Sequence, residues 1–296
     1  MTNEIAIRAL TTAALTGLLL GSGLRLEVRQ VLEVLRQKRL LGRTLAVNFL
    51  GVPALALGIV LVFKVPTEIA VGMLLLAAAP FAPVVPVFTK MARGDLALAA
   101  TLTGIFPLPS AFLTPWICVA CLKMLPGAGE LRFQVLQLLL LLLATITLPL
   151  ATGVALKHYR PSWAKLILRP VEVLAEGIGA ISLAFVTFVE FRTIVDTGWN
   201  ALLAMALLCE LSLFLGYAFG GPSTASRRVI GFGTSNRNIA LALLIAAGSF
   251  AGTPVLAGVV ANGLFLILLG LVHVAWWRWR PNGVDPPSPG FGATGS

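Results

Sequence analysis

The sequence has few charged residues and few of the side chains from which catalytic or metal sites are built. Only 11% of the 296 residues are charged, whereas a soluble domain carries about 25%. Histidine occurs twice, and the apolar segments contain no Ser-His arrangement, paired aspartates or metal-ligand set. We therefore expect neither a soluble domain nor an enzyme, and no metal or cofactor. The three cysteines lie inside apolar segments, so no disulfide framework is expected for Cys118, Cys121 and Cys209.

Hydrophobic residues make up 58% of the chain and form nine runs, each near the roughly 20 residues that a helix needs to cross a bilayer. We therefore expect an all-α polytopic membrane protein with nine transmembrane helices and the lipid bilayer as its surroundings. The net charge of +10 does not indicate nucleic acid, because the basic residues stand in short clusters between apolar runs. The expected spans are approximately Ile5–Leu24, Thr44–Phe63, Thr67–Thr89, Leu96–Leu122, Phe133–Leu156, Val171–Val189, Trp199–Phe219, Val229–Gly248 and Phe250–Trp277.

Two segments outside these runs have other patterns. Between Arg25 and Arg43, apolar residues alternate with basic ones at helical spacing, which predicts a helix lying in the membrane interface. From Pro281 onward the chain is rich in Pro and Gly, which predicts a disordered tail. The chain is thus divided into a transmembrane domain at 1–280 and a tail at 281–296.

Lys and Arg residues predict the orientation of the chain in the membrane. An alternating path through nine spans places sixteen of the 22 basic residues on one side and five on the other, with Arg237 inside a span. Because basic loops stay in the cytoplasm, we expect an outside N-terminus and a cytoplasmic C-terminus in a cell inner membrane. The sixteen are Arg25, Arg29, Arg36, Lys38, Arg39, Arg43, Lys90, Arg93, Lys157, Arg160, Lys165, Arg169, Arg227, Arg228, Arg278 and Arg280.

Two expected spans contain residues that interrupt a helix. Pro80, Pro83 and Pro86 lie in the third span, where each removes an amide donor. The eighth span contains Gly231 and Gly233, followed by five polar residues. Unwound backbone persists within a membrane only when it is buried or lines a wet cavity. If spans one to four recur as spans six to nine, the interruptions correspond and predict two crossing helices around a transporter site. A proline kink with a polar helix contact is the alternative.

Arg237 is expected near the middle of the membrane, because it lies nine residues past Arg228, about 13 Å of helix. A buried arginine there is costly and marks either a functional site or a structural ion pair. Glu210, halfway along its own span, is the expected partner, and its carboxylate either carries a proton or only neutralises Arg237. Glu172 and Glu176 share one face of the sixth span and are expected to be solvated beside basic residues at its cytoplasmic end.

Several short motifs follow one another in a fixed order. They are Pro66–Gly72, Pro80, Ala92–Asp95 and Leu113–Pro115, then Asn238, Leu241–Ala242, Phe250 and Pro254. With these motifs the sequence resembles the bile acid:sodium symporter family over about residues 8–278. The resemblance implies two inverted repeats, here in a nine-span version that lacks the first helix. It also implies a core domain at approximately 44–122 and 199–277, and a panel at approximately 5–24 and 133–189.

The positions at which that family holds sodium carry other residues here. By the resemblance, Val85 and Pro86 stand in place of a Ser-Asn pair, Gly233 in place of a glutamate and Arg237 in place of a glutamine, while Asn48 keeps an amide. Hydroxyl positions of the family's next span fall on Gly104, Phe106 or Pro107. These departures argue against sodium coupling. They leave the Arg237 guanidinium as a fixed cation that can hold a carboxylate by two hydrogen bonds.

The leading hypothesis is a secondary transporter of a small organic anion that works by alternating access without sodium. A membrane sensor or ligand-binding protein that does not transport is an alternative on the same fold. An arsenite-type oxyanion carrier is another, since Cys118 and Cys121 share a helix face, although helix packing is the favoured explanation for them. Substrate identity and oligomeric state stay open. The candidate substrate-binding residues are Arg237, Asn238, Asn236, Ser235, Thr234, Asn48 and Thr89.

Overall fold

The computed structural model describes residues 2–128 and 134–279, and these ranges form helices and turns without a strand. Two helices, η1 and η3, are π-helical. In chain order the helices are α1 (Thr2–Arg25), α2 (Val28–Arg36), α3 (Lys38–Ala46), η1 (Val47–Gly51), α4 (Val52–Val62), α5 (Thr67–Ala77), α6 (Val85–Met91), α7 (Leu96–Ile105), α8 (Pro107–Met124), α9 (Val135–Leu142), η3 (Leu143–Thr147), α10 (Leu148–Tyr159), α11 (Pro161–Val189), α12 (Phe191–Val195), α13 (Trp199–Phe219), α14 (Thr224–Ser235), α15 (Ile239–Ser249) and α16 (Val255–Trp279).

The lengths and composition of these helices are those of a polytopic membrane protein. Eight helical stretches within the described ranges are long and apolar enough to cross a bilayer. The expected third span is not among them, because it is divided into α5, with 11 residues, and α6, with 7 residues. The all-helical membrane class is therefore confirmed, while the count of nine spans and the inverted repeat stay predictions.

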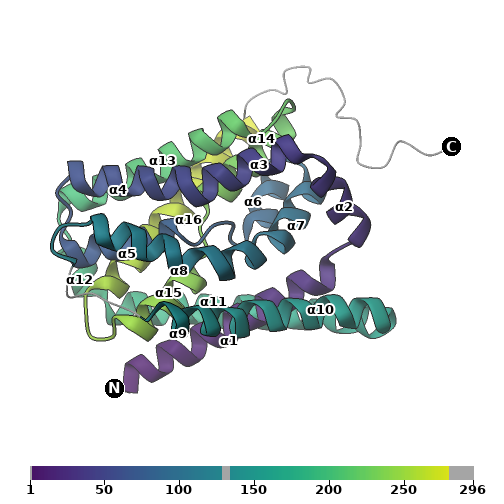
Figure 1. Ribbon diagram of the computed structural model, residues 1–296, viewed down its shortest axis with the longest axis horizontal. Coiled ribbons are helices and arrows are strands. Elements are labelled where there is room, and N and C mark those ends of the chain that lie inside the picture. Colours follow the sequence, from purple (N-terminus) through teal and green to yellow (C-terminus); the bar gives the residue numbers. More distant parts are fainter. Residues whose placement is uncertain (1, 129–133, 280–296) are drawn as a thin grey trace.

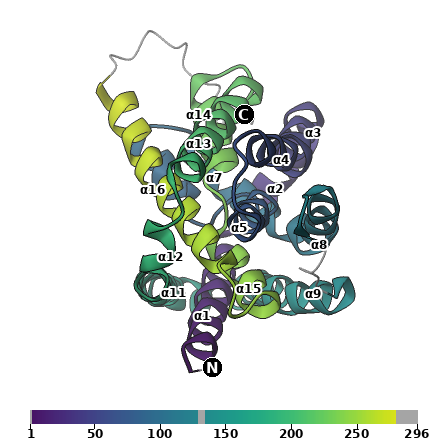
Figure 2. The ribbon, with the colours of Figure 1, turned by 90° about the vertical axis from the view of Figure 1, so that its left-hand side faces the viewer.

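The helices lie in two groups along the length of the molecule. Figure 1 shows α1, α9, α10 and α11 along one side, and α3, α4, α13 and α14 along the other. Helix α1 packs against both α10 and α11, and we call these three helices the α1–α10–α11 layer. In Figure 2, seen from the left of Figure 1, α5 and α16 lie between the two groups. The proposed division into core and panel domains stays a prediction.

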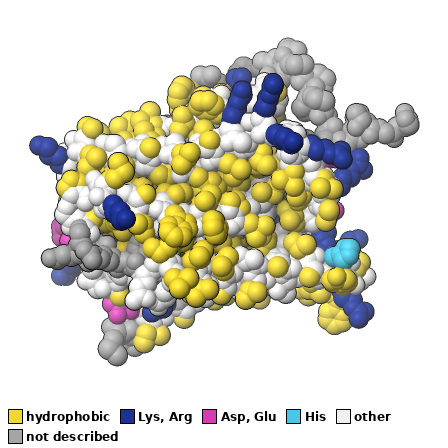
Figure 3. Space-filling view, viewed as in Figure 1, with side chains coloured by type: hydrophobic (Ala, Val, Ile, Leu, Met, Phe, Trp, Pro, Cys, Tyr) yellow, Lys and Arg dark blue, Asp and Glu magenta, His cyan; other side chains and the backbone are white. Residues whose placement is uncertain are grey.

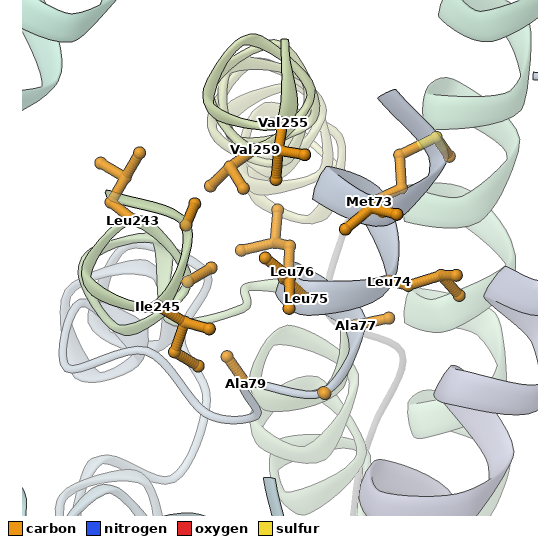
Figure 4. Packing of buried hydrophobic residues seen from close by; sticks show 14 of the residues in the cluster. Met73, Leu74, Leu75, Leu76, Ala77, Ala79, Leu243, Ile245, Val255 and Val259 are labelled. Atoms are coloured by element: carbon orange, nitrogen blue, oxygen red, sulfur yellow. The ribbon is translucent and has the colours of Figure 1, made fainter. Parts of the chain in front are cut away.

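An apolar core fixes the broken helices against their neighbours. Figure 4 shows Leu75 and Leu76 of α5 beside Leu243 and Ile245 of α15 and below Val255 and Val259 of α16. All of these side chains are at most 2% exposed. Burying a large aliphatic side chain stabilises a fold by about 1.5–3 kcal/mol in water. In lipid the tight packing itself holds helices together.

Surface side chains agree with a membrane environment. Large hydrophobic residues are exposed along the flanks, among them Phe188 at 81% and Leu166 at 72%. Figure 3 shows hydrophobic side chains across the middle of the molecule and most of the visible Lys and Arg toward one end. Helix α2, between the first two expected spans, exposes Val28, Leu32 and Leu35, as an interfacial helix should. The predicted tail at 281–296 lies outside the described residues.

The first interruption lies where the prolines predict it. Helix α5 ends at Ala77 and α6 begins at Val85, so Pro80 and Pro83 stand in the unwound stretch between them. Pro86 occupies the first turn of α6, where a missing amide donor costs nothing. The carbonyl of Ala78 accepts a hydrogen bond of 2.8 Å from the Thr114 hydroxyl. That bond partly replaces the lost helical partners.

The second interruption is shorter than the sequence predicts and lies farther along the chain. Helix α14 continues to Ser235, and α15 begins at Ile239, so only Asn236, Arg237 and Asn238 are unwound. Gly231 and Gly233 were expected to break the helix and instead lie within α14. Their role is close packing: a Cβ on Gly233 would lie 2.0 Å from the ring of Phe81. The prediction of these glycines as helix breaks is therefore wrong.

The two unwound stretches hydrogen-bond to each other through their backbones. The amide of Ala82 donates to the carbonyl of Asn236 at 3.0 Å, and the amide of Asn238 donates to the carbonyl of Ala79 at 2.8 Å. This reciprocal pair satisfies backbone groups that neither helix can satisfy, which is the condition for unwound chain inside a membrane. The broken segments, far apart in sequence, thus meet at one place, which we call the crossover.

Candidate functional site

Arg237 lies at the crossover with its side chain only 3% exposed. Its Nη1 donates to Oδ1 of Asn48 at 3.0 Å, and its Nη2 donates to the backbone carbonyl of Asn48 at 3.1 Å. Its Nε is buried without a hydrogen-bond partner in the described structure. Since an arginine side chain remains charged in proteins, the site holds a buried cation whose two contacts are both to neutral groups.

Local sequence explains why Asn48 can receive both bonds. Asn48 lies in the π-helical turn η1, in which the amide of Val52 donates to the carbonyl of Val47. The next residue, Pro53, has no amide hydrogen to offer the carbonyl of Asn48. That carbonyl is therefore free to accept from Arg237. A π-bulge commonly marks a functional site, and a proline five residues after a buried polar residue is the signal that sequence reasoning missed.

The predicted ion pair between Arg237 and Glu210 is not formed. Glu210 lies on α13 with its side chain 43% exposed, and Oε2 lies 3.3 Å from Nε2 of His273. The two side chains of the expected pair therefore face different surroundings. Helical spacing places a residue at a depth in the membrane, but it does not say which neighbour that residue faces, so the sequence argument chose the wrong partner.

The remaining predicted residues divide into two sets. The first set consists of residues that are buried in the structure: Thr234, Ser235, Asn48 and Thr89. Thr234 accepts a hydrogen bond of 3.1 Å from the Asn48 amide, while the Thr89 hydroxyl has no partner in the described structure. The second set lines a cavity and consists of Asn236, Arg237 and Asn238.

This cavity lies between the crossover and the α1–α10–α11 layer. Its volume is about 420 Å³, within the usual range for a small-molecule site. Thr11 and Leu18 of α1 and Ser182 and Leu183 of α11 line one side, and crossover residues line the other. Most of the wall is apolar, so the few polar groups fix what the cavity accepts.

Of the two glutamates expected to be solvated on α11, Glu172 differs from the expectation and Glu176 does not. Glu172 is buried and accepts a hydrogen bond of 2.7 Å from Nη2 of Arg25. Glu176, one turn farther along α11, has an exposed side chain and lines the cavity. The sequence placed both carboxylates on one face correctly, but it did not show that this face packs against α1.

The beginning of α15 adds a second positive feature to the cavity. Asn238 caps this helix, since its side chain accepts a hydrogen bond of 3.0 Å from the amide of Leu241. Ile239 and Ala240 also line the cavity, and first-turn amides have no partner within their own helix. The positive end of the helix dipole therefore lies at the same place as Arg237.

Aromatic rings pack at two of the positions that the resemblance compares with sodium ligands, Phe106 and Gly233. Phe81 has a left-handed backbone with φ of 55°, and its ring stacks on Phe106 with centroids 4.3 Å apart. Phe106 stacks in turn near Phe49, at 5.9 Å. The absence of a side chain at Gly233 makes room for the Phe81 ring. These rings offer no oxygen atom, and hard cations are bound through oxygen.

The thiols lie elsewhere. Cys118 and Cys121 are buried in the main apolar cluster together with residues of α5 and α15, and neither lines the cavity. Helix packing is thus the role that their surroundings support, and the arsenite interpretation gains nothing from the cavity. Over the described ranges, no group of three His, Cys, Asp or Glu residues is placed to hold a metal ion.

Comparisons with known proteins agree with the motifs in the sequence. Residues 12–197 match the Sodium Bile acid symporter family. The chain is 25% identical over 272 residues to the probable sodium/metabolite cotransporter BASS1, chloroplastic, of Arabidopsis thaliana, which covers 90% of this chain and 66% of that protein. It is 28% identical over 173 residues to the uncharacterized sodium-dependent transporter YocS of Bacillus subtilis (strain 168), which covers 57% of this chain and 52% of that protein.

The chain therefore spans from about half to about two thirds of the length of these relatives. The family match itself extends from α1 to just beyond α12, which is more than half of the chain. It is a family of symporters and not of enzymes. The family predicted from the motifs is thus confirmed: this chain belongs to the Sodium Bile acid symporter family.

Proposed function

We propose that the protein is a secondary transporter of a small organic anion and works by alternating access without sodium. The single observation that carries this proposal is Arg237, a buried cation at the crossover that lines a cavity and has no acidic partner among the described residues. A charge near the bilayer centre costs about 2.5–3.5 kcal/mol on insertion scales. An anionic substrate offsets that cost by supplying the missing negative charge.

The arrangement around Arg237 suits a carboxylate. Asn48 fixes the guanidinium at two nitrogen atoms, so its direction is set before a ligand binds, which lowers the entropy cost of binding. The amides of Ile239 and Ala240 in the first turn of α15, both residues of the cavity lining, supply further donors. A planar anion can accept several of these bonds at once.

Independence from sodium is part of the proposal, although the relatives above are named as a sodium/metabolite cotransporter and a sodium-dependent transporter. The support for sodium independence comes from the residues around the crossover. The stacked rings of Phe81 and Phe106 occupy the space beside Gly233, and a bare ion in an apolar site is strongly unfavourable. Arg237 supplies a positive charge at the crossover without a bound cation.

A thermal-shift screen of the purified full chain against small carboxylates, in sodium and in choline buffers, tests this function. We expect ligands to stabilise the protein equally in both buffers, because ligand binding raises the free energy of unfolding. Arg237→Gln should weaken binding by about tenfold to a hundredfold. The matched control is Arg192→Gln, which removes an exposed charge outside the cavity. Strong sodium dependence, or unchanged affinity in Arg237→Gln, contradicts the proposal.

A further inference from the structure

The charges around the cavity carry an inference about the substrate. Among the residues that line it, two are charged: Arg237 at the crossover and Glu176 on α11. The other lining residues of the described ranges are neutral, and most are apolar. Arg237 thus belongs to one wall of the cavity, and Glu176 belongs to the wall formed by the α1–α10–α11 layer.

Neither charge has a counter-ion in the described parts of the chain. Arg237 donates to Asn48 alone. Arg25 of α1, which contacts the same helix one turn away, is held by Glu172 in an ion pair. The described structure contains no ion pair to Glu176, whose exposed side chain lies at the cavity. The cavity lining therefore includes two opposite charges, and neither is paired within the described residues.

A ligand with only a carboxylate satisfies one of the two charges. When the cavity closes during alternating access, Glu176 loses water and is left as an unpaired buried anion, which is unfavourable. A dianion adds direct repulsion. A ligand that carries a cationic group together with its carboxylate pairs with both walls and leaves no net charge in the closed cavity.

We propose that the substrate is a small zwitterion whose carboxylate binds Arg237 and whose ammonium or quaternary ammonium group faces Glu176. This inference rests on the proposed function, because it takes the carboxylate at Arg237 as given. It narrows the organic anion to one that carries its own cation. The volume of about 420 Å³ suits an amino-acid-sized or betaine-sized molecule.

The test uses matched ligands that differ in one charge. Binding of linear ω-amino acids of three to six carbons is measured by titration calorimetry beside the carboxylates that lack the amino group. The wild-type chain should bind at least one zwitterion about tenfold more tightly than its matched carboxylate. Glu176→Gln should abolish that preference while carboxylate binding is kept or improved. Glu68→Gln, which removes a carboxylate outside the cavity lining, should leave the preference unchanged.

The outcomes separate the two proposals. If carboxylates bind through Arg237 but no zwitterion is preferred, or the preference survives Glu176→Gln, the zwitterion proposal is overturned and the proposed function stands. If Arg237→Gln leaves every affinity unchanged, the proposed function fails and this inference fails with it.

Discussion

The guanidinium of Arg237 is held by neutral acceptors, and this choice of partner decides what the residue can do. Both hydrogen bonds go to Asn48, one to its side chain and one to its carbonyl. A carboxylate at the same position would neutralise the cation and remove its attraction for a substrate. The amide instead fixes the geometry and leaves the charge available, so function depends on the difference between an amide and an acid.

This difference can be tested by one substitution. Asn48→Asp places a carboxylate about 3.0 Å from Nη1 of Arg237 and should lower anion affinity by about tenfold to a hundredfold. Asn48→Ala is the matched control, since it removes the side-chain acceptor without adding a charge, and its loss of affinity should be smaller. Titration calorimetry of both variants, with a thermal melt to show that each is folded, decides between them. Equal affinity losses in the two variants would mean that the charge on Arg237 is not what binds the ligand.

Sequence reasoning identified the important residue here but not its neighbours. Arg237 stood out because an ionisable residue within an apolar span is rare, and that signal needs no structure. Glu210 was chosen as its partner by depth alone, and it faces His273 instead. Glu172 was expected to be solvated and is buried, because a helix pattern does not say which face a second helix covers. Which residues pair depends on the rotation of packed helices, and that is a tertiary property.

At the scale of helices, the two broken segments pack closely because residues without a side chain on one segment face large side chains on the other. Prolines remove amide donors wherever they stand, so Pro80 and Pro83 predicted the first break correctly. Glycine has two roles, flexibility and close approach. The sequence does not separate them, and Gly231 and Gly233 were therefore misread. In the structure Gly233 stays helical and makes room for Phe81, whose strained backbone is held by its stack on Phe106.

The close contact between Gly233 and the Phe81 ring predicts that a larger residue at position 233 lowers the stability of the fold. Gly233→Ala brings a methyl group within 2.0 Å of the Phe81 ring, so something must shift, and we expect a loss of about 1–3 kcal/mol of stability. The control is Gly248→Ala on α15, where nothing lies within 4 Å, so this variant should be neutral or slightly stabilising. Melting temperatures in detergent compare the two. Adding Phe81→Leu should recover part of the loss, and wild-type stability of Gly233→Ala alone would show that the two segments do not meet as described.

At the scale of the whole molecule, the positions of the basic residues and of the apolar flanks indicate how the protein is oriented in the membrane. Figure 3 shows most of the visible Lys and Arg toward the end of the molecule where α2 lies, with hydrophobic side chains over its middle. If this end lies in the cytoplasm, the N-terminus lies outside. The all-helical class was predictable from composition alone. The cavity was not predictable, because it forms between helices that are distant in sequence.

The orientation is tested by cysteine labelling. Met124 is 65% exposed at the end of α8, and Ser162 is exposed at the start of α11. An impermeant thiol reagent applied from outside should label Met124→Cys and not Ser162→Cys. The native cysteines are at most 6% exposed and should add little background. The reverse labelling pattern would invert the topology.

Transport by way of Arg237 is the central claim, and uptake into proteoliposomes measures it most directly. Take the tightest ligand from the carboxylate and zwitterion series in labelled form, with choline in place of sodium on both sides and unlabelled ligand inside. The wild-type chain should accumulate label by exchange, and Arg237→Gln should reduce the initial rate at least tenfold while Arg192→Gln keeps it. Uptake that appears only with sodium, or that is the same in Arg237→Gln, contradicts the account.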